Sequence, residues 1–127
     1  MLSMVLLSVM LTVASWYGDA FHGNTMANGE PYNMYAMTAA STEHALGTEL
    51  IVRHENQSVV VEITDRGPYC FEALADGYLV PHPTRGIDLS KGAFAKLALL
   101  SSGLIEVEVR YALPMLWKSP PDTEWYE

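Results

Sequence analysis

The amino-acid sequence predicts a single, mainly β domain folded as a small barrel. Residues 105–111 alternate apolar and polar side chains, the pattern of a strand whose buried face carries Ile105, Val107, Val109 and Tyr111. Two β-rich runs, residues 49–53 and 58–64, are separated by four polar residues that indicate a hairpin turn. A chain of 127 residues is expected to bury one hydrophobic core and not two.

The first half of the chain is predicted to contain one strand followed by a long irregular segment. Residues 13–17 are apolar and aromatic and end at Gly18, which favours a first strand. Residues 18–36 are rich in glycine and include Asn28 and Pro31, so we expect turns and no regular element there.

One short helix is predicted after the middle of the chain. Ser90 is a suitable N-cap for a helix that runs through Ala98 and ends near Gly103. We assign the adjacent leucines to the core, namely Leu97, Leu99 and Leu100. Residues 113–127 form an acidic tail that contains proline, and we expect this tail to be loosely held.

The N-terminal segment, residues 1–12, is apolar and is treated separately from the domain at residues 13–112. It is shorter than the ~20 residues that a membrane-spanning helix needs, and no Lys or Arg precedes its apolar part. Three interpretations remain open: a degenerate export signal, an extension packed on the fold, or an interfacial anchor. No stable membrane anchor is expected.

Composition excludes several classes of function. Seven Lys and Arg stand against fifteen Asp and Glu, for a net charge of −8, which argues against nucleic acid as a partner. The one cysteine, Cys70, excludes an intrachain disulfide framework, and we interpret it as a small apolar residue and not a nucleophile. The four histidines lack metal-ligand spacing, so neither a metal nor a cofactor is expected.

Seven short motifs occur in a fixed order along the chain: SWYG, FHG, ANGE, TAA, GT, DRGP and IDLS. This order resembles the RlpA-like double-psi β-barrel domain of the rare lipoprotein A family, over about residues 13–112. The resemblance implies a six-stranded double-psi barrel with one short helix, long connecting loops and a groove across one side. The barrels of expansins are related to it.

The resemblance also implies a function. Members of this family are endolytic lytic transglycosylases that cleave peptidoglycan glycan strands, preferentially strands lacking stem peptides, and leave 1,6-anhydromuramic acid ends. The implied partner is the glycan strand, and the implied location is the periplasm or the extracellular side of the cell envelope. We expect a monomer.

The family's functional positions map onto residues of this chain. Asp65 in DRGP matches the principal catalytic acid, and Glu30 in ANGE matches a second acidic residue of the groove. The implied substrate-binding positions are Tyr17, Trp16, His22, Ser41, Arg66 and Asp88.

The reaction places a demand on the catalytic acid. A carboxyl that protonates the departing glycosidic oxygen must hold its proton at rest, so its pKa must be raised by burial or by a like charge. Asp65 follows an apolar strand, and Glu30 is a candidate for the like charge. Arg66 would oppose the shift if its guanidinium pointed the same way.

Structural roles are the alternatives for each of these residues. Asp65 is also suited to capping backbone amides in a turn, and Glu30 to a solvated hairpin turn. For Asp88 we favour a structural cap on the helix amides near Ser90 over direct catalysis. Trp16 is compatible with core packing, whereas for Tyr17 stacking on a sugar is an equally good interpretation.

Two departures from the family pattern are evident. Ser41 stands where the family often has His after Thr-Ala-Ala, and His44 is a candidate substitute. A serine hydroxyl does not hold a proton near neutral pH, and losing a proton-handling group typically costs ~10²-fold or more in rate.

The second departure is an insertion at residues 69–84. It begins directly after the DRGP motif, so it is expected to emerge at the edge of the groove. We hypothesise that its aromatic residues Tyr69, Phe71 and Tyr78 narrow the groove or cover a bound strand.

Two classes of function therefore remain, with a weaker third. The first is a lytic transglycosylase that uses Asp65 and Glu30. The second is a non-catalytic cell-wall glycan-binding or expansin-like loosening module on the same barrel. The third, a phage-borne wall-degrading component, is suggested by small size and the weak export signal.

Overall fold

The computed structural model describes residues 9–70 and 80–112, and it contains six strands and one short α-helix within them. The strands are β1 (Met10–Tyr17), β2 (Thr38–Ala40), β3 (Glu49–His54), β4 (Gln57–Asp65), β5 (Arg85–Ser90) and β6 (Ile105–Tyr111). The helix is α3 (Lys91–Ala95), and two short 3-10 turns are η1 (Asp19–Phe21) and η2 (Leu100–Ser102).

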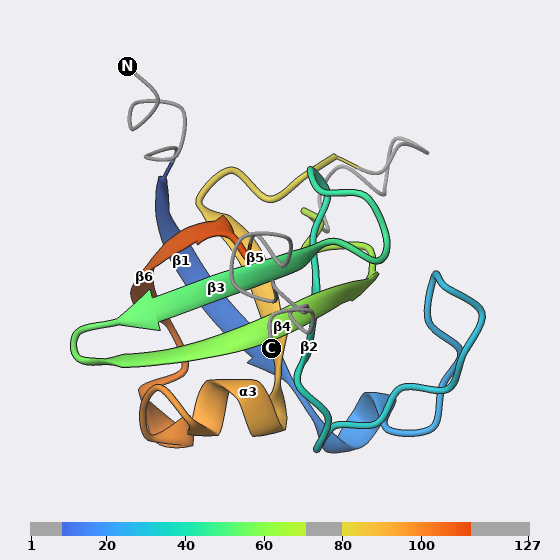
Figure 1. Cartoon of the computed structure of the whole chain (residues 1–127). Coiled ribbons are helices and arrows are strands. Elements are labelled where there is room, and N and C mark those ends of the chain that lie inside the picture. The colour runs from blue at the N-terminus through green and yellow to red at the C-terminus, as the bar shows by residue number, and fades with distance from the viewer. Residues whose placement is uncertain (1–8, 71–79, 113–127) are drawn as a thin grey trace, which may run out of the picture.

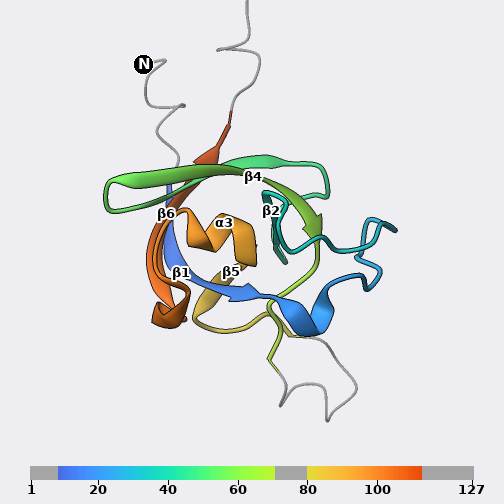
Figure 2. The same cartoon turned by 90° about the horizontal axis from the view of Figure 1, so that it is seen from below.

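The six strands close into a barrel in the order β1-β5-β2-β4-β3-β6. The pairs β1–β5 and β2–β4 are parallel, whereas the other pairs are antiparallel. Figure 1 and Figure 2 show α3 across one end of the barrel. The predicted six-stranded barrel with one short helix is confirmed.

The core is built by apolar side chains that point inward from the strands. Ala39 on β2, Ile63 on β4 and Leu89 on β5 are fully buried and point into the barrel, where Phe94 of α3 closes the interior. Ala40 and Asp88, which are neighbours of Ala39 and Leu89 in the sequence, are paired with each other and lie on the opposite face of these strands.

Three predicted elements are confirmed in detail. The β3–β4 hairpin turns at Glu55 and Asn56, between the paired residues His54 and Gln57. The Ser90 side chain caps α3 by accepting a hydrogen bond from the Ala93 amide at 3.1 Å. The alternating segment is β6 with the predicted bounds.

Other details differ from the sequence-based expectation. β1 begins at Met10, three residues early, because Met10, Leu11 and Thr12 find ladder partners on β6. The helix α3 ends at Ala95, short of the predicted Ala98. Leu99 directly precedes η2 and is 76% exposed, so its assignment to the core is wrong. Tyr111 is 52% exposed at the end of β6, where its ring contacts His44 instead of the core.

Some expectations lie outside the described residues. These are the interpretations of residues 1–8, the character of residues 113–127, and the roles of Phe71 and Tyr78 in the insertion. Within the described parts, no helix is long and apolar enough to cross a membrane.

Candidate functional site

Four side chains from four neighbouring strands form one row on the outer face of the barrel, which we call the carboxylate row. Ser15 on β1 is paired with Asp88 on β5, and Asp88 is paired with Ala40 on β2. Ala40 is in turn paired with Asp65 on β4. Directly opposed residues share one face of a sheet. The row therefore places two carboxyl groups on either side of one small side chain.

A β-bulge brings Asp65 into this row. Ala39 is paired with Ile63, and the register shifts before Ala40, so that Ala40 is opposite Asp65 instead of Thr64. Bulges of this kind re-aim a side chain at the end of a strand. The Cα atoms of Asp65 and Asp88 are then two inter-strand spacings apart, about 10 Å in a flat sheet.

Asp88 lies in a largely enclosed environment. Its Oδ1 accepts a hydrogen bond from the Ser15 hydroxyl at 3.1 Å, and the Arg85 guanidinium donates to the same hydroxyl oxygen at 3.2 Å. Burial raises the pKa of Asp88 from 3.8 to about 6, against the opposing effects of Ser15 and Arg85 and with a smaller upward contribution from the Asp65 charge. The site thus contains a carboxyl group that takes up a proton close to neutral pH.

Asp65 is held by backbone amides. Its Oδ1 accepts hydrogen bonds from the amides of Ala27 and Arg66, each at 2.9 Å. The Arg66 guanidinium points elsewhere, since its Nη1 donates to the carbonyl oxygens of Ser41 at 2.9 Å and His44 at 2.7 Å. Arg66 therefore fixes the loop after β2 and forms no ion pair with Asp65 among the described residues.

Tyr17 approaches both carboxyl groups from β1. Its ring is stacked on Tyr32 at a centroid distance of 4.2 Å, and the Tyr32 hydroxyl donates to the Tyr17 carbonyl oxygen at 2.6 Å. The Tyr17 hydroxyl is enclosed, and no hydrogen bond of good geometry reaches it from the described part of the chain. Burial, followed by the charge of Asp65, raises the pKa of Tyr17, so the hydroxyl keeps its proton. Burial raises the pKa of Tyr32 to about 12.

Glu30 is exposed on the loop that supplies an amide to Asp65. The loop is tied to the end of β4 by the Asn28 amide, which donates to the Thr64 carbonyl oxygen at 3.2 Å. The Glu30 amide donates to the Asn28 side chain at 2.9 Å, which fixes the backbone of this turn. The carboxyl group that raises the pKa of Asp88 is Asp65 and not Glu30.

Ser41 is fully buried beside the site, and its side chain holds the backbone of the loop after β2. Its hydroxyl oxygen accepts hydrogen bonds from the amides of Glu43 and His44, and it lies 3.1 Å from the His44 ring Nδ1. The His44 ring lies edge-to-face against Tyr111 on β6 at 5.5 Å. No described contact joins His44 to Asp65, so the structure gives His44 no place in the carboxylate row.

The two remaining predicted residues, Trp16 on β1 and His22 directly after η1, have different surroundings. Trp16 points inward, where its ring packs at 6.3 Å from Phe94 and its Nε1 donates to the Leu100 carbonyl oxygen at 3.1 Å. His22 is exposed, and its Nδ1 accepts a hydrogen bond from the Met34 amide at 3.2 Å. Trp16 therefore belongs with the core, and His22 with the surface beyond Tyr17.

The structure thus joins Tyr17, Asp65 and Asp88, and adds neighbours that sequence reasoning missed. These are Ser15, Tyr32, Ala40 and Arg85. For Asp88, the cap on α3 that we favoured is provided by Ser90 itself, and the Asp88 carboxyl group faces Ser15. The period of two along β1 was the available signal for Ser15, because it places Ser15 and Tyr17 on the same face.

The insertion leaves and returns close to Asp65. The Cys70 amide donates to the Val80 carbonyl oxygen at 2.9 Å, and the His82 amide donates to the Pro68 carbonyl oxygen at 3.0 Å. Tyr69 forms a bridge with Pro81 between these two bonds. The described base of the insertion is therefore a short paired ribbon attached directly to the DRGP segment.

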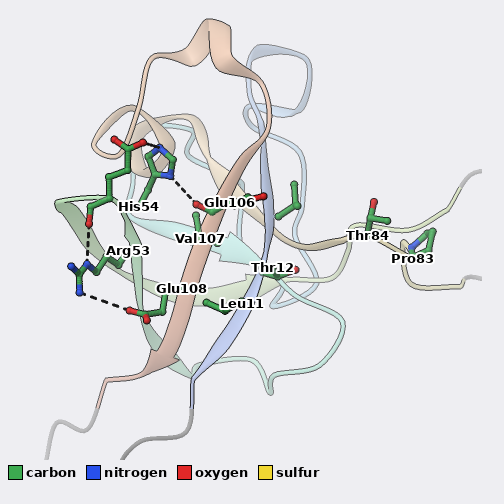
Figure 3. Close-up of a pocket in the computed structure, with 11 residues that line it drawn as sticks. Leu11, Thr12, Arg53, His54, Pro83, Thr84, Glu106, Val107 and Glu108 are labelled. Carbon is green, nitrogen blue, oxygen red and sulfur yellow. Dashed lines mark hydrogen bonds and ion pairs between the residues drawn. The ribbon is translucent and has the colours of Figure 1, made fainter.

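A large open hollow of about 930 Å³ lies elsewhere on the barrel (Figure 3). Its walls come from β1, β3 and β6 and from the segment before β5, and neither Asp65 nor Asp88 lines it. It holds mixed charges, with Arg53 and Glu108 at 4.0 Å from each other. Charge, burial and an enclosed hydroxyl group come together instead at the carboxylate row.

A metal centre finds no support in the described residues. No group of three or more His, Cys, Asp or Glu side chains is close enough together there to hold an ion.

Comparison with known proteins agrees with this architecture. Residues 11–109 match the family model described as lytic transglycolase. The endolytic peptidoglycan transglycosylase RlpA of Pseudomonas aeruginosa (strain UCBPP-PA14) is 37% identical over 110 residues, which is 85% of this chain and 29% of that protein. The protein of the same name from Campylobacter jejuni is 38% identical over 99 residues, 76% of this chain and 32% of its own length. The chain thus spans less than a third of these relatives.

Solved structures show the same fold. The Streptomyces papain inhibitor aligns with a TM-score of 0.61 at 22% identity, over 85% of this chain and 97% of that one. A mutant Clavibacter michiganensis expansin in complex with cellohexaose aligns with a TM-score of 0.59 at 23% identity, over 84% of this chain and 51% of the expansin. With the family match and the RlpA relatives, these likenesses show that the chain belongs to the lytic transglycolase family and is an RlpA-like double-psi β-barrel.

Proposed function

We propose that this domain is an endolytic peptidoglycan lytic transglycosylase that cleaves glycan strands and leaves 1,6-anhydromuramic acid ends. The observation that carries the proposal is the pair of carboxyl groups on either side of Ala40, one of which has a pKa of about 6. Membership of a family whose relatives are named endolytic peptidoglycan transglycosylases supports it.

The two carboxyl groups are suited to different proton transfers. Asp88, in its protonated form, gives a proton to the glycosidic oxygen as the bond to the anomeric carbon breaks. Asp65 takes the proton of the muramic acid O6 hydroxyl as that oxygen attacks the anomeric carbon, which closes the 1,6-anhydro ring. One proton is delivered and one is recovered, so no water is consumed.

This assignment moves the resting proton from Asp65 to Asp88. Asp65 accepts two backbone amide hydrogen bonds on one oxygen, which orients the carboxylate toward a substrate. Asp88 has the burial that keeps a carboxyl group protonated. Glu30, on the loop that donates the Ala27 amide, shapes the rim of the site and is not required for either transfer.

The substrate and location follow from the same proposal. We infer that the substrate is a peptidoglycan strand lacking stem peptides, reached in the periplasm or outside the cell. The acidic chain would disfavour anionic polymers in general. Arg85 next to the carboxylate row supplies a local positive charge for the lactyl carboxylate that such strands expose. We expect the domain to act as a monomer.

Mass spectrometry of digested, denuded peptidoglycan tests the proposal. The wild-type protein should release fragments with 1,6-anhydromuramic acid ends, and D65N and D88N should each lower the yield by at least ~10²-fold. D19N is the matched control, since Asp19 is an exposed carboxylate paired with Lys91 at 3.1 Å. Ends that incorporate water would instead indicate hydrolysis.

A second candidate function is favoured by Ser41. This residue is buried and engaged with backbone amides, so the proton-handling side chain usual at this position in the family is missing. A non-catalytic glycan-binding or expansin-like loosening module would need no such group. Retained sedimentation with glycan strands, without any cleavage at high protein concentration, would favour this alternative.

A further inference from the structure

Three aromatic side chains are presented to solvent beside the carboxylate row. Phe21 is 51% exposed and Tyr35 is 64% exposed, and the His22 ring between them in sequence is also exposed. All three belong to the segment between β1 and β2, which reaches out beyond the barrel in Figure 1. Exposed apolar rings that gather in one place usually mark a binding surface. We call these residues the aromatic platform.

The platform is held in place by the backbone around it. The Tyr32 amide donates to the Asn24 carbonyl oxygen at 2.7 Å, and the Gly23 amide donates to the Tyr32 carbonyl oxygen at 2.8 Å. The Gly92 amide at the start of α3 donates to the Met34 carbonyl oxygen at 2.8 Å. These bonds tie the two halves of the segment to each other and to the barrel, so the rings are displayed on a fixed support.

The side chains of the platform are oriented as well. The His22 ring accepts the Met34 amide on Nδ1 at 3.2 Å and meets the Tyr35 ring edge-to-face at 5.8 Å. The Tyr35 amide donates to the Asn33 side chain at 3.0 Å, which fixes the turn that presents Tyr35. With Nδ1 occupied as an acceptor, a neutral His22 carries its proton on Nε2 as a donor.

Tyr17 connects the aromatic platform with the carboxylate row. Phe21 meets the Tyr17 ring edge-to-face at 5.8 Å, and Tyr17 is the ring whose hydroxyl is close to Asp65. A ligand that lies across Phe21 and Tyr35 therefore extends from the residues that carry out the proposed chemistry. The platform itself contains no carboxylate, so a negatively charged sugar substituent is not repelled by its own side chains.

We propose that the aromatic platform of Phe21, His22 and Tyr35 is a distal sugar-binding subsite for the same glycan strand. Phe21 and Tyr35 stack on the apolar faces of pyranose rings, and His22 Nε2 donates a hydrogen bond to a sugar hydroxyl or carbonyl oxygen. This inference rests on the proposed function for the identity of the polymer. Its consequence is that long strands bind more tightly than strands too short to reach from the carboxylate row to the platform.

Binding and cleavage measurements on purified, denuded glycan strands of defined length test this subsite. Y35A should weaken binding of long strands by about tenfold and the double variant F21A/Y35A by more, because each stacked ring buries apolar surface. Binding of strands too short to span both places should remain unchanged. The rate at saturating long strands should also remain unchanged, so the effect appears in KM and not in kcat.

Y111A is the matched control, because Tyr111 is 52% exposed but lies on β6. Thermal unfolding identifies any variant that loses its fold, and Y35A, whose ring does not contact Tyr17, guards against indirect effects of F21A. Wild-type affinity for long strands in folded Y35A and F21A/Y35A would overturn the subsite. Length-dependent binding that is lost in these variants, with no anhydro ends from the wild-type protein, would uphold the subsite and overturn the transglycosylase proposal.

Discussion

Asp65 and Asp88 are on different strands, β4 and β5, and both are paired with the same residue of β2, Ala40. Because the intervening side chain is a single methyl group, nothing on β2 separates the two carboxyl groups. Their mutual repulsion contributes to the raised pKa of Asp88, although burial contributes more. The barrel therefore creates one carboxyl group that holds a proton near neutral pH beside another that is oriented by backbone amides.

Replacing Asp88 by Asn should raise stability at high pH although it lowers activity. The folded-state pKa of Asp88 is about 6 against 3.8, so the folded protein binds more protons than the unfolded chain between these pH values. The free energy of unfolding therefore falls as pH rises through this window. Above about pH 6 the wild-type protein bears the full destabilisation that comes from ionising the buried Asp88. Asn does not ionise and still accepts from Ser15. D88N should be more stable than wild type at pH 8, on the order of 1 to 2 kcal/mol, and unchanged at pH 4.

Chemical denaturation of both proteins across this pH range measures the difference. D19N, which alters an exposed carboxylate, should not show a stability gain that grows from pH 4 to pH 8. A D88N protein that is destabilised equally at both pH values would mean that Asp88 has a purely structural role.

Replacing Ser15 by Ala should shift the pH dependence of activity. The hydrogen bond from Ser15 lowers the pKa of Asp88, so its removal should raise that pKa further. If Asp88 donates the proton, activity falls as pH rises through its pKa. The descending limb of kcat/KM against pH should then move upward by up to about one pH unit in S15A. S58A, a change at an exposed serine of β4, is the control.

An unshifted limb in S15A would remove Asp88 from the acid role. Such a result would leave Asp65 as the remaining candidate of the row.

The barrel could be predicted from the sequence because its signals are local. Strict alternation fixed the bounds of β6, and the four polar residues at 54–57 placed the β3–β4 hairpin. The early start of β1 could not be predicted in this way. Its first residues are strand because they pair with β6, which follows about a hundred residues later.

The site was less accessible to sequence reasoning. The resemblance pointed to Asp65 and Asp88, but their roles depend on a bulge between Ala39 and Ala40 that leaves no local signal. Whether Arg66 would affect Asp65 depended on where its side chain points, which the sequence does not show. In the structure its guanidinium donates to the carbonyl oxygens of Ser41 and His44. Burial of Asp88 likewise arises from the packing of three strands and not from its neighbours in sequence.

Replacing Ser41 should affect stability more than catalysis. Its hydroxyl oxygen accepts two backbone amides at 3.0 and 3.1 Å in a fully buried position. S41A would leave these amides without that acceptor, so the free energy of unfolding should fall by about 1–3 kcal/mol. The pH profile of the remaining activity should keep its shape. Urea unfolding and a pH–rate profile measure the two effects, and a displaced profile at unchanged stability would instead place Ser41 in the chemistry.

Replacing Tyr17 by Phe should lower activity without lowering stability. The phenyl ring preserves the stack on Tyr32 and the edge contact with Phe21, whereas the lost hydroxyl is enclosed without a well-aligned partner in the described residues. Removing an unsatisfied buried hydroxyl is neutral or stabilising. Because this hydroxyl is close to Asp65 and remains protonated, it is placed to donate a hydrogen bond in the reacting complex, and kcat of Y17F should fall by about tenfold.

Y32F provides the contrast, since the Tyr32 hydroxyl donates to the Tyr17 carbonyl oxygen and its loss should reduce the melting temperature. Thermal unfolding and single-turnover cleavage of the two variants distinguish these roles. If Y17F loses stability to the same extent as Y32F while cleaving at the wild-type rate, the Tyr17 hydroxyl serves only the packing of the loop on β1.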